Sequence, residues 1–158
     1  MSGEMIRTTA IKPVPNAFCP GCLHSMASKL IGESLEELGL IEKTVMVIPV
    51  GCSTMGLNFW KMDMVSAAHG RAPAVAVGIK RVQPESFVFA YQGDGDLASI
   101  GLSEVLSAAN RGEKITVIFA NNSTYGMTGG QLAPTTLVGQ KATTAPRGRN
   151  PETEGYPT

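Results

Sequence analysis

The chain has 158 residues, of which 43% are hydrophobic and 16% are charged, and its formal net charge is zero. These values predict one globular domain with a real core, and they exclude a disordered chain. A balanced charge gives no electrostatic case for binding nucleic acid or an anionic membrane. No apolar run reaches the length of a membrane span and residues 1–16 lack the apolar segment of a signal peptide, so we expect a cytoplasmic protein.

The predicted elements alternate between helices and strands. After an extended arm over residues 1–18, apolar residues recur at helical spacing from Leu23 to Leu38, and Gly39 stands where a helix end favours glycine. The apolar run 44–50 is typical of a strand buried on both faces. A helix over 73–82, a strand over 87–91, a helix over 97–110 and a strand over 115–120 follow, and then an irregular region that ends in the tail 141–158.

Strands separated by helical segments predict parallel βαβ units. We therefore expect an α/β fold in which helices cover both faces of a parallel sheet. Each predicted strand is followed at once by a polar, glycine-rich turn: Gly51-Cys52-Ser53, Gly93–Asp96 and Asn121–Gly130. Ligands bind at the carboxyl ends of the strands in open parallel sheets, so the three turns predict one composite site.

Asp94 and Asn122 bring a carboxylate and a carboxamide to two of these strand ends. Such oxygen ligands suit Mg²⁺, which usually completes its octahedral shell with substrate phosphates and water. The glycines beside Asp94 let the backbone approach a diphosphate closely. The alternative interpretation is that both are ordinary turn residues, because Asp, Asn and Gly dominate turns in any case.

The sequence contains three cysteines, in the motif Cys19-Pro20-Gly21-Cys22 and at Cys52. The first pair alone is compatible with half of a zinc site, a thioredoxin-like redox pair or part of an iron–sulfur cluster. The redox pair is disfavoured because that motif normally follows a strand, and here it follows the arm. Cys52 at a predicted strand end favours three thiolates next to a cofactor, and hence an electron carrier.

Five segments together resemble the thiamine-diphosphate-binding β subunit of 2-oxoacid:ferredoxin oxidoreductases, most closely the branch that acts on 3-methyl-2-oxobutanoate (2-ketoisovalerate). The resemblance covers essentially the whole chain. Its motif of GDG followed by NN is moderately specific for thiamine diphosphate enzymes, and the combination with CPGC and GCS is highly specific for this family. The segments are residues 18–24, 50–53, 69–72, 93–96 and 121–131.

The resemblance implies a set of site residues. Mg²⁺ would be bound by the Asp94 carboxylate, the Asn122 side-chain oxygen and the Thr124 backbone carbonyl. Cys19, Cys22 and Cys52 would hold three corners of a 4Fe–4S cluster, and the family takes the fourth thiolate from beyond the end of this sequence. His69 is the candidate catalytic residue. The cofactor pocket would be formed by Val50, Gly51, Cys52, Ser53, His69, Gly93, Gly95, Asp96, Gly126 and Met127.

The implied activity is oxidative decarboxylation of a 2-oxoacid, with 3-methyl-2-oxobutanoate favoured, to acyl-CoA and CO₂. Electrons would pass through the cluster to ferredoxin, and coenzyme A would accept the acyl group. No glutamate stands at a matching strand end to activate thiamine diphosphate, so the resemblance implies an α-type partner subunit that supplies it. We expect one thiamine-diphosphate-binding domain over 1–158, forming the N-terminal part of a longer β subunit. The alternatives are a metal-stabilised module without turnover, and a truncated protein that keeps the pocket but lacks cluster and activity.

Overall fold

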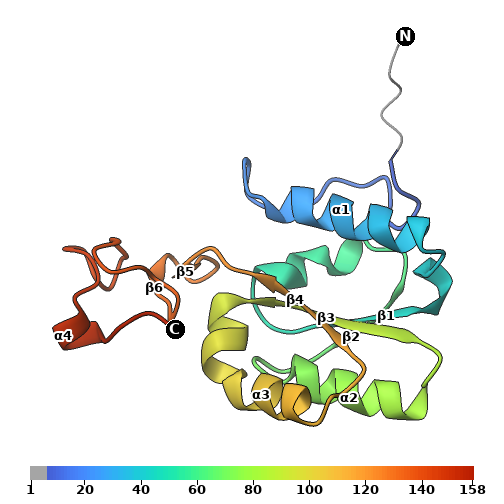
Figure 1. The fold of residues 1–158 in the computed structure, drawn as a ribbon. Helices are drawn as coiled ribbons and strands as arrows, with labels where there is room; N and C mark the ends of the chain where they lie inside the picture. Colours follow the sequence, from blue (N-terminus) through green and yellow to red (C-terminus); the bar gives the residue numbers. More distant parts are fainter. Residues whose placement is uncertain (1–6) are drawn as a thin grey trace.

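A computed structural model describes residues 7–158, so the first six residues of the predicted arm lie outside the described residues. Four parallel strands form the central sheet in the order β2-β1-β3-β4 (Figure 1). The strands are β1 (Thr44–Ile48), β2 (Asp63–Ser66), β3 (Phe87–Gly93) and β4 (Thr116–Ala120). The predicted α/β class with a parallel sheet is confirmed.

Helices cover both faces of this sheet. Helix α1 (His24–Glu37) lies over one face, together with the 3₁₀ helix η2 (Cys52–Asn58), while α2 (Ala72–Val82) and α3 (Leu102–Asn110) lie over the other (Figure 1). A short 3₁₀ helix, η1 (Ile41–Lys43), leads into β1. Pro73 occupies the first turn of α2, where its missing N–H costs no helical hydrogen bond.

The core has one apolar cluster on each face of the sheet. Strand β1 is buried along its whole length, as the absence of polar alternation predicted. One cluster contains large side chains such as Trp60, Phe89 and Tyr91, and the other contains small ones, including Ala72 and Ala76 of α2. The smaller side chains let α2 pack closely on the sheet, since they keep its backbone near the strands.

Two elements differ from the sequence prediction. Strand β2 was not predicted, because three of its four residues are exposed at the sheet edge and it has no apolar pattern. The helix expected over 97–110 is interrupted: a π-helical turn, η3 (Asp96–Ile100), precedes α3. In this turn the Gly101 N–H bonds to the Asp96 carbonyl at 2.8 Å. Gly101 also lies close to Gly70, since a Cβ on Gly101 would lie 2.5 Å from the Gly70 oxygen.

The chain beyond β4 runs to one side of the sheet (Figure 1). Two short antiparallel strands, β5 (Thr124–Tyr125) and β6 (Gln131–Leu132), form a small hairpin there. The tail 141–158 is less irregular than predicted, because it contains a one-turn helix, α4 (Pro151–Glu154), capped by the Asn150 side chain. In the described part of the chain, no helix is long and apolar enough to cross a membrane.

Candidate functional site

A pocket of about 120 Å³, open to solvent, lies at the carboxyl ends of the sheet strands. Three of these strand ends were predicted, and β2 adds a fourth, because His69 follows it. All predicted magnesium ligands and cofactor residues line it: Val50, Gly51, Cys52, Ser53, His69, Gly93, Asp94, Gly95, Asp96, Asn122, Thr124, Gly126 and Met127.

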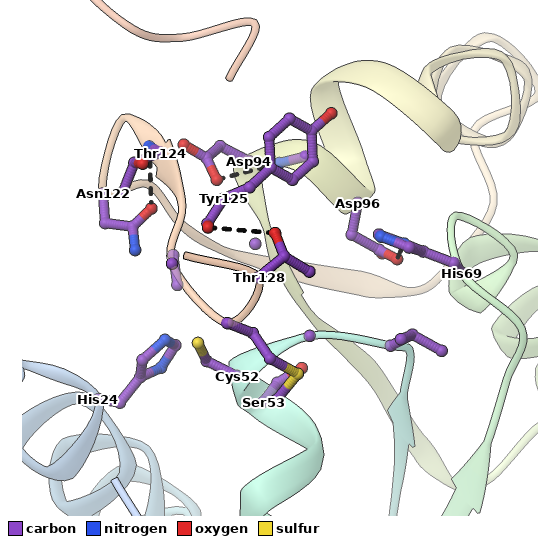
Figure 2. A pocket seen from close by; sticks show the side chains of 17 residues that line it. His24, Cys52, Ser53, His69, Asp94, Asp96, Asn122, Thr124, Tyr125 and Thr128 are labelled. Atoms are coloured by element: carbon purple, nitrogen blue, oxygen red, sulfur yellow. Dashed lines mark hydrogen bonds and ion pairs between the residues drawn. The ribbon is translucent and has the colours of Figure 1, made fainter. Parts of the chain in front are cut away.

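Strand register brings two of the three predicted magnesium ligands together. Gly93, the last residue of β3, pairs with Ala120, the last residue of β4. The residues that follow, Asp94 and Asn122, therefore leave the sheet side by side, although they are far apart in sequence. Figure 2 shows Asp94, Asn122 and Thr124 on one side of the pocket.

Asp94 is a buried carboxylate, only 3% exposed. Its Oδ1 accepts the Gly95 N–H at 3.0 Å and its Oδ2 accepts the Thr135 hydroxyl at 2.7 Å. Both donors are neutral, and no Lys, Arg or His within residues 7–158 forms an ion pair with this carboxylate. Burying a carboxylate without a cation is costly, so the arrangement suits a bound metal ion.

Two consecutive side-chain turns shape the loop after β4. The Asn121 carboxamide accepts the Ser123 N–H at 3.0 Å, and the Asn122 carboxamide accepts the Thr124 N–H at 3.3 Å. Ser123 has a φ of 60°, which is uncommon for a residue other than glycine. Asn122 and Thr124 both line the pocket, and the Thr124 carbonyl accepts the Gly126 N–H at 3.0 Å. A carbonyl oxygen has a second lone pair, so the predicted ligation by a side-chain oxygen and a carbonyl stays a prediction.

A histidine–carboxylate pair forms another side of the pocket (Figure 2). Asp96 bonds to Nδ1 of His69, and it also accepts the Gly70 N–H at 2.6 Å and a bond from the Gln92 side-chain amide. Asp96 is buried, whereas the His69 side chain is 34% exposed. The three bonds fix the imidazole orientation, and no hydrogen bond within the described chain uses its Nε2. This nitrogen is therefore available to a ligand.

Four glycines remove side chains from the pocket wall: Gly51, Gly93, Gly95 and Gly126. Gly51 has a φ of 140°, a conformation that side chains rarely allow, and Gly126 lies where a Cβ would come within 3.2 Å of the Asn122 amide. Backbone groups can therefore approach a bound molecule closely. Such a wall fits a diphosphate, which is bound by backbone N–H groups in many proteins.

The three cysteines differ in their position relative to the pocket. Cys52 lines the pocket and is half-buried, whereas Cys19 is exposed and Cys22 is half-buried outside the pocket lining. Burial raises the pKa of the Cys52 thiol, and the nearby Cys22 and Cys19 thiols raise it further. Within residues 7–158, no three His, Cys, Asp or Glu side chains form a group that could hold a single metal ion. Ligation of a cluster by the three thiols stays a prediction.

Several pocket residues were missed from the sequence. His24 lines the pocket beside Cys52, stacks on Phe18 and forms a 2.6 Å hydrogen bond with the Tyr91 hydroxyl. Burial lowers the pKa of His24 and, with the Cys22 and Cys52 thiols, raises the pKa of Tyr91 to about 12. The place of His24 directly after the cysteine pair was the available signal. Ala120, Tyr125 and Thr128 also line the site; the last two lie in the predicted turn Asn121–Gly130 but were not singled out within it.

Comparisons with known proteins agree with this geometry. The family model for the thiamine pyrophosphate enzyme C-terminal TPP binding domain matches residues 49–156. The chain belongs to this family of thiamine pyrophosphate enzymes. The matched region contains the polar turns of the pocket but not the first two cysteines.

This chain has relatives that are named as subunits. It is 54% identical over 145 residues to ketoisovalerate oxidoreductase subunit VorA of Methanothermobacter thermautotrophicus, covering 92% of this chain and 30% of that one. It is 41% identical over 136 residues to 2-oxoglutarate synthase subunit KorB of Methanocaldococcus jannaschii, covering 85% of this chain and 50% of that protein.

A solved structure resembles the whole pocket-bearing fold. It is the 2-oxoglutarate:ferredoxin oxidoreductase from Magnetococcus marinus with 2-oxoglutarate, coenzyme A and succinyl-CoA bound. The TM-score is 0.83 at 33% identity, covering 92% of this chain and 50% of that chain. This chain thus spans at most about half the length of these relatives.

Proposed function

We propose that the chain is the thiamine-diphosphate- and Mg²⁺-binding part of a 2-oxoacid:ferredoxin oxidoreductase. The reaction is oxidative decarboxylation of a 2-oxoacid to acyl-CoA and CO₂ in the cytoplasm, with ferredoxin as the electron acceptor. The favoured substrate is 3-methyl-2-oxobutanoate, because identity to the ketoisovalerate relative (54%) exceeds identity to the 2-oxoglutarate relative (41%).

The observation that carries this proposal is the buried Asp94 carboxylate without a cationic partner in the described chain. Asp94, the Asn122 carboxamide and the Thr124 carbonyl offer Mg²⁺ three oxygen ligands at one side of the pocket. Protein ligands of this number leave positions for phosphate oxygens and water, which Mg²⁺ normally retains. The metal would then join the protein to the diphosphate group.

The pocket wall would accommodate the rest of the cofactor. Gly51, Gly93, Gly95 and Gly126 leave room for the diphosphate, while Val50, Ser53 and Met127 line the pocket beside them. When bound, thiamine diphosphate supplies the carbon nucleophile and the electron-storing ring that decarboxylation of a 2-oxoacid requires.

His69 is the residue we assign to proton exchange with substrate or cofactor. The Asp96 carboxylate, itself held by Gly70 and Gln92, bonds to Nδ1 and so fixes the imidazole plane. The other ring nitrogen, Nε2, remains to donate or accept one hydrogen bond at the pocket. A mobile imidazole would transfer protons poorly, because the ring nitrogen must first lie within hydrogen-bonding distance of the proton it exchanges.

The three thiolates would hold part of an iron–sulfur cluster. A 4Fe–4S cluster, when bound, accepts electrons one at a time and passes them to ferredoxin. Cys52 lines the cofactor pocket. A cluster bound through Cys52 would therefore lie beside the cofactor, so electron transfer would have a short path from the pocket.

An α-type partner subunit would complete the site. The outer face of α1 exposes three large apolar side chains, Leu23 (75%), Met26 (57%) and Leu30 (55%), at helical spacing. Such a stripe is typical of a protein–protein contact rather than of a free surface. The relatives named as subunits support the same interpretation.

The test is to produce the chain with an α-type subunit anaerobically and to measure iron, sulfide and thiamine in the purified complex. The proposal predicts all three, together with reduction of a one-electron dye that depends on both 2-oxoacid and coenzyme A. Comparison of kcat/KM for 3-methyl-2-oxobutanoate and 2-oxoglutarate then decides the substrate. Zinc without thiamine would instead identify a non-catalytic module, and thiamine without iron or turnover would identify a protein that keeps only the pocket.

A further inference from the structure

Two adjacent threonines outside the pocket lining reach back to the predicted magnesium ligands. The Thr135 hydroxyl donates a 2.7 Å hydrogen bond to Oδ2 of Asp94, 41 residues away in sequence. The Thr136 hydroxyl donates a 2.7 Å bond to the carbonyl of Ser123. Ser123 stands between Asn122 and Thr124 in sequence. Thr135 therefore contacts the predicted ligand Asp94, and Thr136 contacts the loop that carries the predicted ligands Asn122 and Thr124.

Both threonines are held in one orientation. Thr135 is 6% exposed and Thr136 is fully buried. The Thr136 hydroxyl also accepts the Ala133 N–H at 2.8 Å, so its own proton must point to Ser123. Buried polar side chains with every bond made have little freedom, which fixes the distance between Asp94 and the loop after β4.

Arg149 fixes the backbone around the two threonines. Its guanidinium group is buried, at 6% exposure, and no Asp or Glu within the described residues forms an ion pair with it. Instead it donates to six backbone carbonyls. Three precede it, in Ala133, Pro134 and Thr136, and three follow it, in Glu154, Gly155 and Tyr156.

A buried cation that binds only carbonyls is costly unless nearly all its donors are used, and Arg149 uses Nε, Nη1 and Nη2. The fork geometry of arginine suits this role, whereas the single ammonium group of lysine does not. The C-terminal segment is thereby tied into one unit that presents Thr135 and Thr136 to the site.

We propose that Thr135 and Thr136, fixed by Arg149, are positioning residues that set the spacing of the magnesium ligands. The inference rests on the proposed function, since it concerns the same metal. Mg²⁺ demands near-ideal octahedral geometry at short distances, whereas Ca²⁺ accepts flexible and longer ligation. A rigid spacing of the ligands therefore favours Mg²⁺ over Ca²⁺, and a loosened one reduces this preference.

The test compares Thr135→Val, which removes the hydroxyl at similar volume, with Thr135→Ser, which keeps it. Retention of thiamine diphosphate by the full chain is titrated with Mg²⁺ and separately with Ca²⁺. Removing a group that orients a metal ligand typically costs about 10–100-fold in metal affinity. The Mg²⁺ concentration that gives half-maximal retention should therefore rise at least about tenfold in Thr135→Val. The Ca²⁺ requirement should rise by less than about threefold, because that ion tolerates disordered ligands.

The control variant is Thr153→Val, an exposed threonine in the same segment, which should match the wild type for both ions. Thr135→Ser should also match it. Equal losses in Thr135→Val and Thr135→Ser, or equal shifts for Mg²⁺ and Ca²⁺, would overturn the proposal, because both results indicate packing alone. If Thr135→Val does not fold, Thr135→Ala is compared with Thr135→Ser under the same criteria.

A second measurement needs no cofactor. Thr136→Val should speed amide hydrogen exchange at Ser123 and Thr124 at least about tenfold, since the bond to the Ser123 carbonyl holds that loop. Unchanged exchange would overturn the proposal for Thr136. If Thr136→Val speeds exchange in this way but the wild-type chain retains no thiamine diphosphate, the proposed function is refuted and the role of Thr136 in holding the loop still stands.

Discussion

Gly95 provides a sharp test of how closely the pocket is packed. A Cβ on this residue would lie 2.6 Å from Cδ1 and 2.7 Å from Cζ of Tyr125, and closer still to Cε1. Real Cβ contacts this short do not occur, so Gly95→Ala must displace the Tyr125 ring from the pocket wall. The backbone itself accepts alanine, because Gly95 has helical angles of φ −65° and ψ −34°.

Two opposing effects set the magnitude. Overpacking costs about 1–3 kcal/mol, while replacing a helical glycine by alanine gains roughly 0.5–1 kcal/mol. The difference spans about 0–2.5 kcal/mol, and because the overlap with the Tyr125 ring is severe we expect Gly95→Ala to lower the free energy of unfolding by about 1–2 kcal/mol. For a domain of this size, that corresponds to a fall in Tm of roughly 2–8 °C.

The assay is a double-mutant cycle that combines Gly95→Ala with Tyr125→Ala, in which the stability of each variant is measured by thermal denaturation without ligand. In the Tyr125→Ala background the overlap is gone, so Gly95→Ala should stabilise the protein by roughly 0.5–1 kcal/mol. Gly78→Ala in α2 is the matched control, since nothing lies within 4 Å of its Cβ position and it should stabilise in both backgrounds. A Gly95→Ala variant that is destabilised equally with and without the Tyr125 ring would refute the reasoning.

Three further predictions concern other parts of the site. His69→Asn should lower the kcat of the assembled enzyme at least about tenfold with little change in thiamine diphosphate retention, whereas loss of retention would show a binding role instead. The Tyr91 phenol, whose pKa is raised to about 12 mainly by burial, should ionise near that pH in an ultraviolet titration, and ionisation near pH 10 would contradict this. Because the folded pKa lies above the unfolded value of 10, the contribution of Tyr91 to stability is complete below pH 10 and is lost as the pH rises towards 12. Leu30→Gln on the exposed face of α1 should leave Tm within about 2 °C but weaken assembly with the partner subunit in a sedimentation assay, and unchanged assembly would exclude this face.

Much of the fold could be predicted because buried strands and helices have characteristic runs or spacings of apolar residues. Strand β1 is buried on both faces and appears as an uninterrupted apolar run. Strand β2 has no such pattern, since it is short, lies at the edge and exposes most of its residues. The π-helical turn before α3 was not predicted either, and it lies where Gly101 approaches Gly70, a residue distant in sequence.

In the candidate site, too, the residues marked by a regular sequence pattern were predicted and the others were not. Residues directly after strands, such as Asp94 and Asn122, were predicted because parallel topology alone brings strand ends together. Thr135 and Arg149 were not, because their bonds to Asp94 and to the surrounding carbonyls depend on an irregular segment without periodicity. The apolar spacing of α1 predicted a helix correctly but not that Leu23 and Leu30 would be exposed, since periodicity does not distinguish a core from an interface.

Calorimetric titration of thiamine diphosphate into the chain, with Mg²⁺ and then with a chelator, tests the central claim most directly. The account predicts saturable binding only with the divalent ion, loss of that binding in Asp94→Ala, and a smaller loss in Asn122→Ala, because water can replace one neutral ligand. Binding that is equally tight without Mg²⁺, or an unchanged affinity in Asp94→Ala, would contradict the assignment of this pocket.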